Sequence, residues 1–420
     1  MRKRYIIYLV ILVVAIFSEH QFLVYREGEA ILDRMIAERD NNATRVYLLL
    51  IDAADPKIIN YLIDKGQLPN FKRLKEEGAY GELQSFAVKT ATGQEIFLSL
   101  PIIATIFTGV SPEEHGMTSH LFMAEGPEYF YPFKDIKSKT VWQIASENGR
   151  SVGIVGIEGE YPVERLNGFV VSGEYFIREI AVRNVQYGQG LVTKAKFPLK
   201  RLVSPTNLNG VLEDLDLPRI DAAFRALDID YDFPSPVESK FRQSWERTLK
   251  NSPKEGLQLA LQFLLSNKTA YYVFARDYQP MQVAGGLYSS YKPELFVEYL
   301  PGMDYFGIMY NTDEYADRND LNNAMFQYYR FFDEHLGRIM NAIDNNAVLL
   351  VVSDHGVKPS GPLSQFNLAD MKSDKGIFLA YGKGIEKGLQ IQGSVYDVAP
   401  TTLDLLRLPI PQQMKGKVTV

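Results

Sequence analysis

The sequence contains no cysteine and only five histidines among its 420 residues. The absence of cysteine excludes disulfide bonds, thiolate metal ligands and cysteine nucleophiles. Any metal site must therefore use carboxylates, hydroxyls and the few imidazoles. Basic residues are fewer than acidic ones, 45 against 51, and the net charge of −6 argues against nucleic acid as a partner.

The amino terminus carries an apolar run over 5–17 that follows three basic residues at 2–4. This layout is typical of an export signal. Apolar residues resume over 22–25 and no small-residue cleavage site follows, so we expect residues 1–25 to be an uncleaved signal anchor, with a cleaved signal peptide as the alternative. The positive-inside rule then places the bulk of the chain outside the cytoplasm, periplasmic or extracellular, with the polar segment 26–44 as a stem.

The rest of the chain alternates strand and helix patterns, which predicts an α/β fold with a mostly parallel central sheet flanked by helices. An apolar strand pattern over 45–51 ends at Asp52, and a second one over 347–352 is followed by Asp354 and His355. Ligands in open α/β sheets bind at the carboxyl ends of the strands. These side chains therefore predict one site assembled from distant segments.

The alternation is lost over residues 173–294, where proline, charged and aromatic residues are interleaved without a clear period. We interpret this interval as a cap inserted into a catalytic domain that spans 45–420. Its aromatic residues are equally typical of ordinary packing, so they identify no ligand.

Ser99 opens a short apolar helix pattern, and we expect it to cap that helix. A capping serine is usually only structural, but its companions change the interpretation. Asp52, Asp354 and His355 offer oxygen and nitrogen ligands suited to zinc or a similar divalent ion. A helix amino end also offers N–H groups to an anionic phosphoryl oxygen. Together these residues predict a metal, a nucleophile and an anion site in one place.

Six ordered blocks extend this pattern along the chain. They are IDAADPKIINYLIDKGQLPNFKRLKEEGAYGEL, SLPIIATIFTGVSPEEHGM, TVWQIASENGRSVGIVGIEGEYPVERLNGFVVSG, VEYLPGMD, YYRFFDEHLGRIMNAIDNNAVLLVVSDHG, and GIFLAYGKGI with SVYDVAPTTLDLLRLPIPQQMKGKV. In these blocks the chain resembles the alkaline phosphatase superfamily, specifically its type I phosphodiesterase/nucleotide pyrophosphatase family. The resemblance implies an alkaline phosphatase-like, sulfatase-like sheet, and it covers nearly all of residues 46–418 outside the cap.

The resemblance also implies roles for individual residues. Asp52, Asp354 and His355 match the ligands of one metal, and Ser99 stands where the family has its threonine or serine nucleophile, whose oxygen completes that shell. Asp304 in YLPGMD matches the aspartate that binds the family's second metal.

The second metal site departs from the family. Ile308 replaces a histidine four positions after the aspartate, and Lys372 replaces a histidine before the GIFLA strand. His120 is a poor substitute ligand, and His115 matches a block in which we favour a structural role. Ala53, where the family usually has glycine, is a milder departure.

We therefore expect one well-formed metal site, with Zn²⁺ as the ion and Mn²⁺ as the alternative. The second site is doubtful: Asp304 would bind a weak second ion or pair with Lys372. The Lys372 ammonium is a candidate for the missing positive charge beside the leaving group, although a solvent-facing lysine is an equally good interpretation.

The expected function is that of a membrane-anchored, extracytoplasmic, metal-dependent phosphoric ester hydrolase or phosphotransferase with Ser99 as its nucleophile. Its partners would be the membrane, through the amino terminus, and a phosphate-ester substrate such as a lipid head group or a surface glycan phosphate. The alternative is a pseudoenzyme that serves as a binding or assembly factor of the cell envelope. Retention of every residue around Ser99 favours the enzyme.

Overall fold

The computed structural model describes residues 30–89, 95–118, 121–122, 129–130, 133–176, 201–215, 273–310, 321, 324–357 and 372–420. The predicted signal anchor, His20, His120 and most of the predicted cap lie outside these residues. No helix in the described part of the chain combines the length and the apolarity that a membrane span requires.

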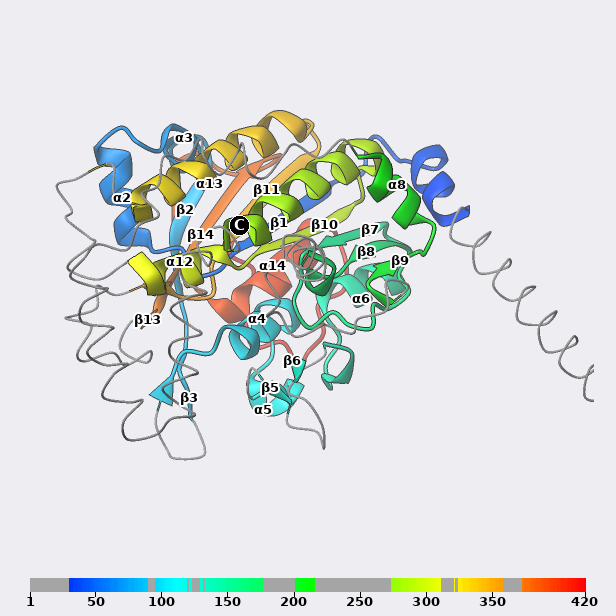
Figure 1. The fold of residues 1–420 in the computed structure, drawn as a ribbon, viewed down its shortest axis with the longest axis horizontal. Helices are drawn as coiled ribbons and strands as arrows, with labels where there is room; N and C mark the ends of the chain where they lie inside the picture. Colours follow the sequence, from blue (N-terminus) through cyan, green and yellow to red (C-terminus); the bar gives the residue numbers. More distant parts are fainter. Residues whose placement is uncertain are drawn as a thin grey trace, which may run out of the picture.

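A nine-stranded sheet forms the middle of the molecule (Figure 1). Its strands in spatial order are β15 (Leu389–Ser394), β2 (Ala79–Gln84), β14 (Lys375–Gly382), β11 (Ala347–Val352), β1 (Arg45–Ile51), β10 (Leu295–Leu300), β7 (Val152–Val155), β8 (Gly168–Val171) and β9 (Val203–Ser204). Among these nine strands, β14 and β9 run against the other seven. The predicted mostly parallel α/β sheet is confirmed.

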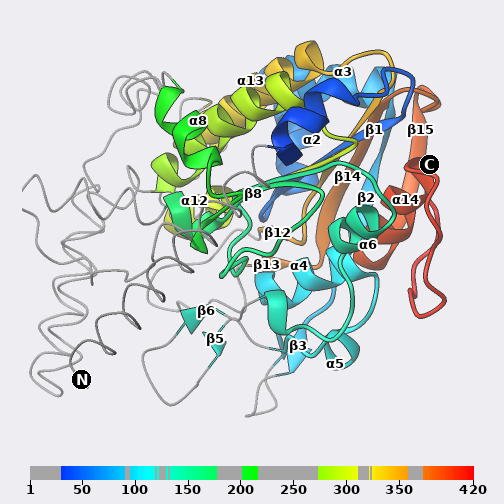
Figure 2. The same ribbon diagram turned by 90° about the vertical axis from the view of Figure 1, so that its right-hand side faces the viewer.

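Helices cover both faces of this sheet, as Figure 2 shows. The helices on one face are α2 (Pro56–Asp64), α3 (Pro69–Glu77), α13 (Ala324–Ala342) and a helical segment over 273–291. Those on the other face are α4 (Ser99–Thr108), α6 (Val141–Glu147) and α14 (Val398–Leu405). Other helices in the described part of the chain include α5 (Pro112–His115), α8 (Leu208–Asp214), α12 (Gly302–Tyr310) and the short 3₁₀ turns η1 (Phe133–Asp135) and η5 (Val395–Asp397).

Three two-stranded pairs lie outside the main sheet. They are β3 (Val88–Lys89) with β4 (Glu95–Ile96), β5 (Leu121–Phe122) with β6 (Tyr129–Phe130), and β12 (Gly356–Val357) with β13 (Lys372–Ser373).

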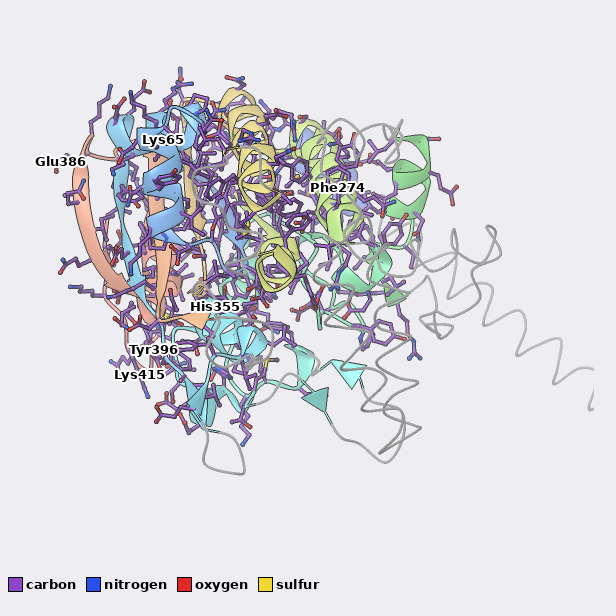
Figure 3. The ribbon with its side chains drawn as sticks, turned by 60° about the vertical axis from the view of Figure 1, so that its left-hand side comes forward. Lys65, Phe274, His355, Glu386, Tyr396 and Lys415 are labelled. Carbon is purple, nitrogen blue, oxygen red and sulfur yellow. The ribbon has the colours of Figure 1, made fainter. Side chains whose placement is uncertain are left out.

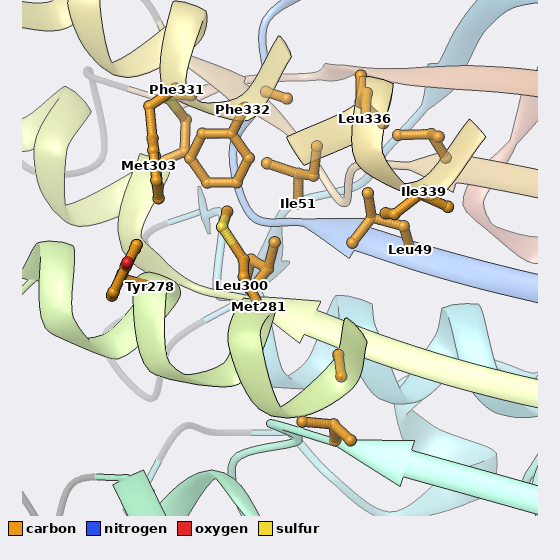
Figure 4. Packing of buried hydrophobic residues seen from close by; sticks show 14 of the residues in the cluster. Leu49, Ile51, Tyr278, Met281, Leu300, Met303, Phe331, Phe332, Leu336 and Ile339 are labelled. Atoms are coloured by element: carbon orange, nitrogen blue, oxygen red, sulfur yellow. The ribbon is translucent and has the colours of Figure 1, made fainter. Parts of the chain in front are cut away.

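Strand β1 contributes side chains to two hydrophobic cores, one on each face of the sheet. Its residues alternate between the faces of the sheet, so Leu49 and Ile51 pack in one core while Leu48 and Leu50 pack in the other. All of them are fully buried, as a continuous apolar run in a parallel sheet predicts. Figure 4 shows the first core, where Leu49 and Ile51 meet side chains from the segment 273–291 and from α13.

Parts of the predicted stem and cap pack with the main domain. Residues 30–37 are helical, and Leu32 and Met35 are buried in the first core. β9 extends the central sheet, and the helical segment 273–291 brings Phe274 and other apolar side chains to the same core. The extent of a separate cap stays a prediction.

Candidate metal centre

Three neighbouring strands end at the same edge of the sheet. β1 lies between β11 and β10, and the register pairs its last residues with the last residues of both neighbours. Asp52 follows β1, Asp354 and His355 follow β11, and Asp304 lies in the first turn of α12 after β10. Figure 3 shows His355 where the strands end, facing the cyan segment that contains α4. The parallel register therefore gathers four side chains of the types that can bind a metal ion.

The side chains of Asp52, Asp304 and Asp354 each have an oxygen close to His355 Nε2. His355 Nε2 lies 3.5 Å from Asp52 Oδ1, 3.3 Å from Asp354 Oδ2 and 3.9 Å from Asp304 Oδ1. Ligand atoms of Asp52, Asp304 and His355 all lie within 4.8 Å of one another. All four side chains are buried. Carboxylates this close repel one another unless a positive charge lies between them, so the donor set fits a divalent cation.

Ser99 reaches the same cluster from the amino end of α4. Its hydroxyl donates to Asp52 Oδ1 at 3.3 Å and lies 3.2 Å from His355 Nε2. The expectation that Ser99 caps the helix is wrong, because the N-cap residue is Leu98 and no side chain bonds the helix end. The hydroxyl points at the carboxylates and the imidazole instead, where a nucleophile would be needed.

Neighbouring backbone groups orient the ligands. His355 Nδ1 lies 3.0 Å from the carbonyl oxygen of Gly356, which can only accept, so Nδ1 carries the proton and Nε2 faces the carboxylates. The amide of Ala53 donates to Asp354 Oδ1 at 3.1 Å. Asp354 Oδ2 is buried and, within the described residues, accepts no hydrogen bond. A cation would satisfy this oxygen.

Ala53 occupies the left-handed region of the backbone, with a φ of 59°. This conformation costs a residue with a Cβ about 1 kcal/mol or more. The departure from glycine therefore places backbone strain directly beside Asp52.

Tyr299 is a site residue that the sequence did not single out. Its hydroxyl donates to Asp52 Oδ2 at 2.6 Å. Burial, together with the negative charges of Asp52 and Asp354, raises the pKa of Tyr299 well above its usual value, so the hydroxyl keeps its proton. Its position one residue before the end of β10 is the signal that could have identified it.

The structure describes only part of Lys372 and Ile308, the two residues that stand where the family has histidines at its second metal site. The backbone of Lys372 lies in β13, where it pairs with Val357, two residues after His355. The side chains of Lys372 and Ile308 lie outside the described part of the structure. The role assigned to Lys372 stays a prediction.

His115 and His335 are buried away from the cluster of Asp52, Asp304 and His355. His115 accepts a hydrogen bond at Nδ1 from the amide of Met117 at 3.1 Å, and its Nε2 lies 3.1 Å from Thr105 Oγ1. Burial lowers the pKa of His115 to about 4, so the ring is neutral and ties the loop after α5 to α4. His335 Nε2 lies 3.1 Å from Glu298 Oε1 within the first core.

The sequence profile of the type I phosphodiesterase / nucleotide pyrophosphatase family matches residues 46–405. The chain belongs to this family. The resemblance to this family is confirmed, and with it the predicted class of enzyme, a hydrolase.

Individual relatives are more distant. A curated 2,3-bisphosphoglycerate-independent phosphoglycerate mutase of Antithamnion sp. is 28% identical over 102 residues, which are 23% of this chain and 19% of that protein. The chain thus spans about a fifth of the length of this relative.

Solved structures of similar fold include a variant of the alkaline phosphatase PafA, at 12% identity and a TM-score of 0.50, covering 90% of this chain and 98% of that one. A 2-O GAG sulfatase has 12% identity and a TM-score of 0.48, covering 89% and 72%. A phosphonoacetate hydrolase from Sinorhizobium meliloti 1021 has 17% identity and a TM-score of 0.42, covering 77% and 59%. At 12% identity, the likeness to the PafA variant shows the fold alone.

Proposed function

We propose that this family member is a phosphoric ester hydrolase or phosphotransferase, anchored in the membrane with its site outside the cytoplasm, that forms a covalent phosphoseryl intermediate at Ser99. One observation carries the proposal: the Ser99 hydroxyl lies 3.3 Å from Asp52 Oδ1 and 3.2 Å from His355 Nε2, inside a cluster of buried ligands. A serine that only capped a helix would have no such neighbours.

The proposed cofactor is one divalent cation held by Asp52, Asp304, Asp354 and His355. Bound there, it would supply a Lewis acid that lowers the pKa of the serine hydroxyl and offsets charge on the phosphoryl group. Zn²⁺ suits the imidazole, and Mn²⁺ is the alternative because three carboxylates favour a harder ion. The 3.9 Å between Asp304 Oδ1 and His355 Nε2 supports a single shared centre.

The protein's own groups would carry the phosphoryl transfer as follows. Ser99 Oγ loses its proton to water and forms a bond to phosphorus, while the bond from phosphorus to the leaving oxygen breaks and that oxygen takes a proton from water. Water or a second alcohol then takes the phosphoryl group from Ser99. In the first turn of α4, Ser99 and Leu100 have amide hydrogens and Pro101 has none, so a phosphoryl oxygen at this helix end would accept from the first two residues of the helix.

The proposed substrate is a phosphate ester at the membrane surface, a lipid head group or a glycan phosphate. The support is the predicted signal anchor, which would hold the site within reach of the membrane. In this proposal Lys372 lies beside the leaving oxygen and supplies the positive charge that a second metal provides elsewhere in the family.

Replacement of Ser99 tests the proposal directly. Ser99→Ala should lower turnover of an aryl phosphodiester or phosphomonoester by on the order of 10³-fold or more, because no nucleophile remains. Ser99→Thr is the matched control, since it keeps the hydroxyl that the family uses, and it should retain measurable activity. Equal rates for wild type and Ser99→Ala would refute a phosphoseryl intermediate.

The second candidate function is a binding or assembly factor of the cell envelope. Replacement of the second-site histidines by Ile308 and Lys372 favours it, because half of the family's metal centre is altered. Such a protein would bind one metal ion yet turn over neither monoesters nor diesters, with or without Ser99.

A further inference from the structure

We propose that Tyr299 is the positioning residue that fixes Asp52 for metal binding, an inference that rests on the metal centre of the proposed function. The two oxygens of Asp52 have different partners. Oδ2 accepts the Tyr299 hydrogen bond at 2.6 Å, while Oδ1 lies 3.3 Å from Ser99 Oγ and 3.5 Å from His355 Nε2. The carboxylate therefore offers one oxygen to the centre and has the other held by the protein.

The fold holds Tyr299 rigidly in this position. It lies on β10, where the register sets it beside Leu50 of β1, two residues before Asp52. Its ring is 2% exposed and packs in the second core. Asp52 follows the last residue of β1, and its amide donates to the carbonyl oxygen of Leu300 on β10 at 3.0 Å, so the sheet holds its backbone while the hydroxyl of Tyr299 holds its side chain.

A carboxylate that is already held in one orientation loses less conformational entropy when it binds a cation. Without the hydroxyl, Asp52 keeps the 3.3 Å hydrogen bond from Ser99 at Oδ1 but loses the 2.6 Å bond at Oδ2, so its side chain is less restricted before a cation binds. Some groups hydrogen-bond a metal ligand without binding the metal themselves. Their removal typically lowers metal affinity by about 10–100-fold. The same range is expected for the loss of the Tyr299 hydroxyl.

The protein provides a matched control in Tyr47. This tyrosine lies on the neighbouring strand β1, is also 2% exposed, and also donates a 2.6 Å hydrogen bond to a buried carboxylate, Oε2 of Glu298. Its partner Glu298 lies 3.1 Å from His335 Nε2, and neither Glu298 nor His335 belongs to the metal cluster. Tyr47→Phe therefore removes an equivalent hydroxyl without touching a ligand.

The test compares Tyr299→Phe with Tyr47→Phe in the full chain after the metal has been removed by a chelator. Zinc dissociation constants are measured by competition with a chromophoric chelator, and urea unfolding midpoints are measured on the metal-free proteins. We expect a zinc dissociation constant about 10–100-fold higher for Tyr299→Phe and within about twofold of wild type for Tyr47→Phe. The unfolding midpoints of the two variants should be lowered to a similar extent.

Two results would overturn the inference: an unchanged zinc affinity in Tyr299→Phe, or an equal loss of affinity in Tyr47→Phe, which would mean that general destabilisation is the cause. The measurement needs no substrate, so it is separate from the test of Ser99. A wild-type protein that binds no zinc would overturn the metal centre itself, and this inference with it.

Discussion

The attachment of α12 depends on a buried carboxyl group, Asp277. Its Oδ1 accepts a hydrogen bond from the amide of Gly302 at 2.9 Å, and its Oδ2 accepts one from the hydroxyl of Tyr328 at 2.6 Å. Gly302 is the first residue of α12, the helix that carries Asp304. A Cβ at position 302 would lie 2.1 Å from Asp277 Oδ2, so only glycine allows this close approach. Asp277 therefore anchors the helix that brings Asp304 to the cluster.

This anchor makes stability depend on pH. Burial raises the pKa of Asp277 from 3.8 to about 7 in the folded protein, against the hydrogen bonds from Tyr328 and Gly302, which lower it. The unfolded chain releases this proton near pH 4, whereas the folded protein keeps it until about pH 7. The contribution of Asp277 is therefore fully present below pH 4 and is lost as the pH rises to 7. Over about three pH units it amounts to on the order of 4 kcal/mol.

Asp277→Asn removes this titration and keeps an oxygen that can accept from the Gly302 amide. We expect the free energy of unfolding of the variant, minus that of wild type, to increase from pH 4 to pH 7 by on the order of 4 kcal/mol and to level off above pH 7. Urea unfolding at a series of pH values, with a chelator present so that metal binding does not contribute, measures this difference. All other groups titrate in both proteins and cancel. Parallel pH profiles for the two proteins would refute the assignment.

Two further predictions concern the centre itself. His355→Ala should lose the bound metal, which elemental analysis of wild type should show at about one ion per chain; a variant that retains its ion would contradict the proposed ligand set. Lys372→Ala should lower kcat for a phosphate ester much more than it weakens metal binding, because in the proposed function its charge stabilises the leaving oxygen; an unchanged kcat would remove Lys372 from the mechanism.

Local patterns in the sequence were sufficient to predict the strands whose ends carry the site residues. Apolar runs of the length of β1 and β11 can be buried on both faces only within a parallel sheet, so the charged residues that follow them had to lie at its carboxyl edge. Asp52, Asp354 and His355 could therefore be chosen together. The altered second site was also visible in the sequence, because Ile308 and Lys372 lack imidazoles.

Other features depended on the tertiary structure. The position of β10 beside β1 and the first turn of α12 bring Asp304 Oδ1 to 3.9 Å from His355 Nε2, a proximity that the sequence could not show. Ser99 had the sequence context of a helix cap, and its true neighbours come from strands 47 and 256 residues away in the chain. No motif in the sequence distinguishes Tyr299 from other buried strand residues. Amino-acid order determines which segments are strands and which residues end them, but strand order and register arise from long-range pairing, and these decide which side chains meet.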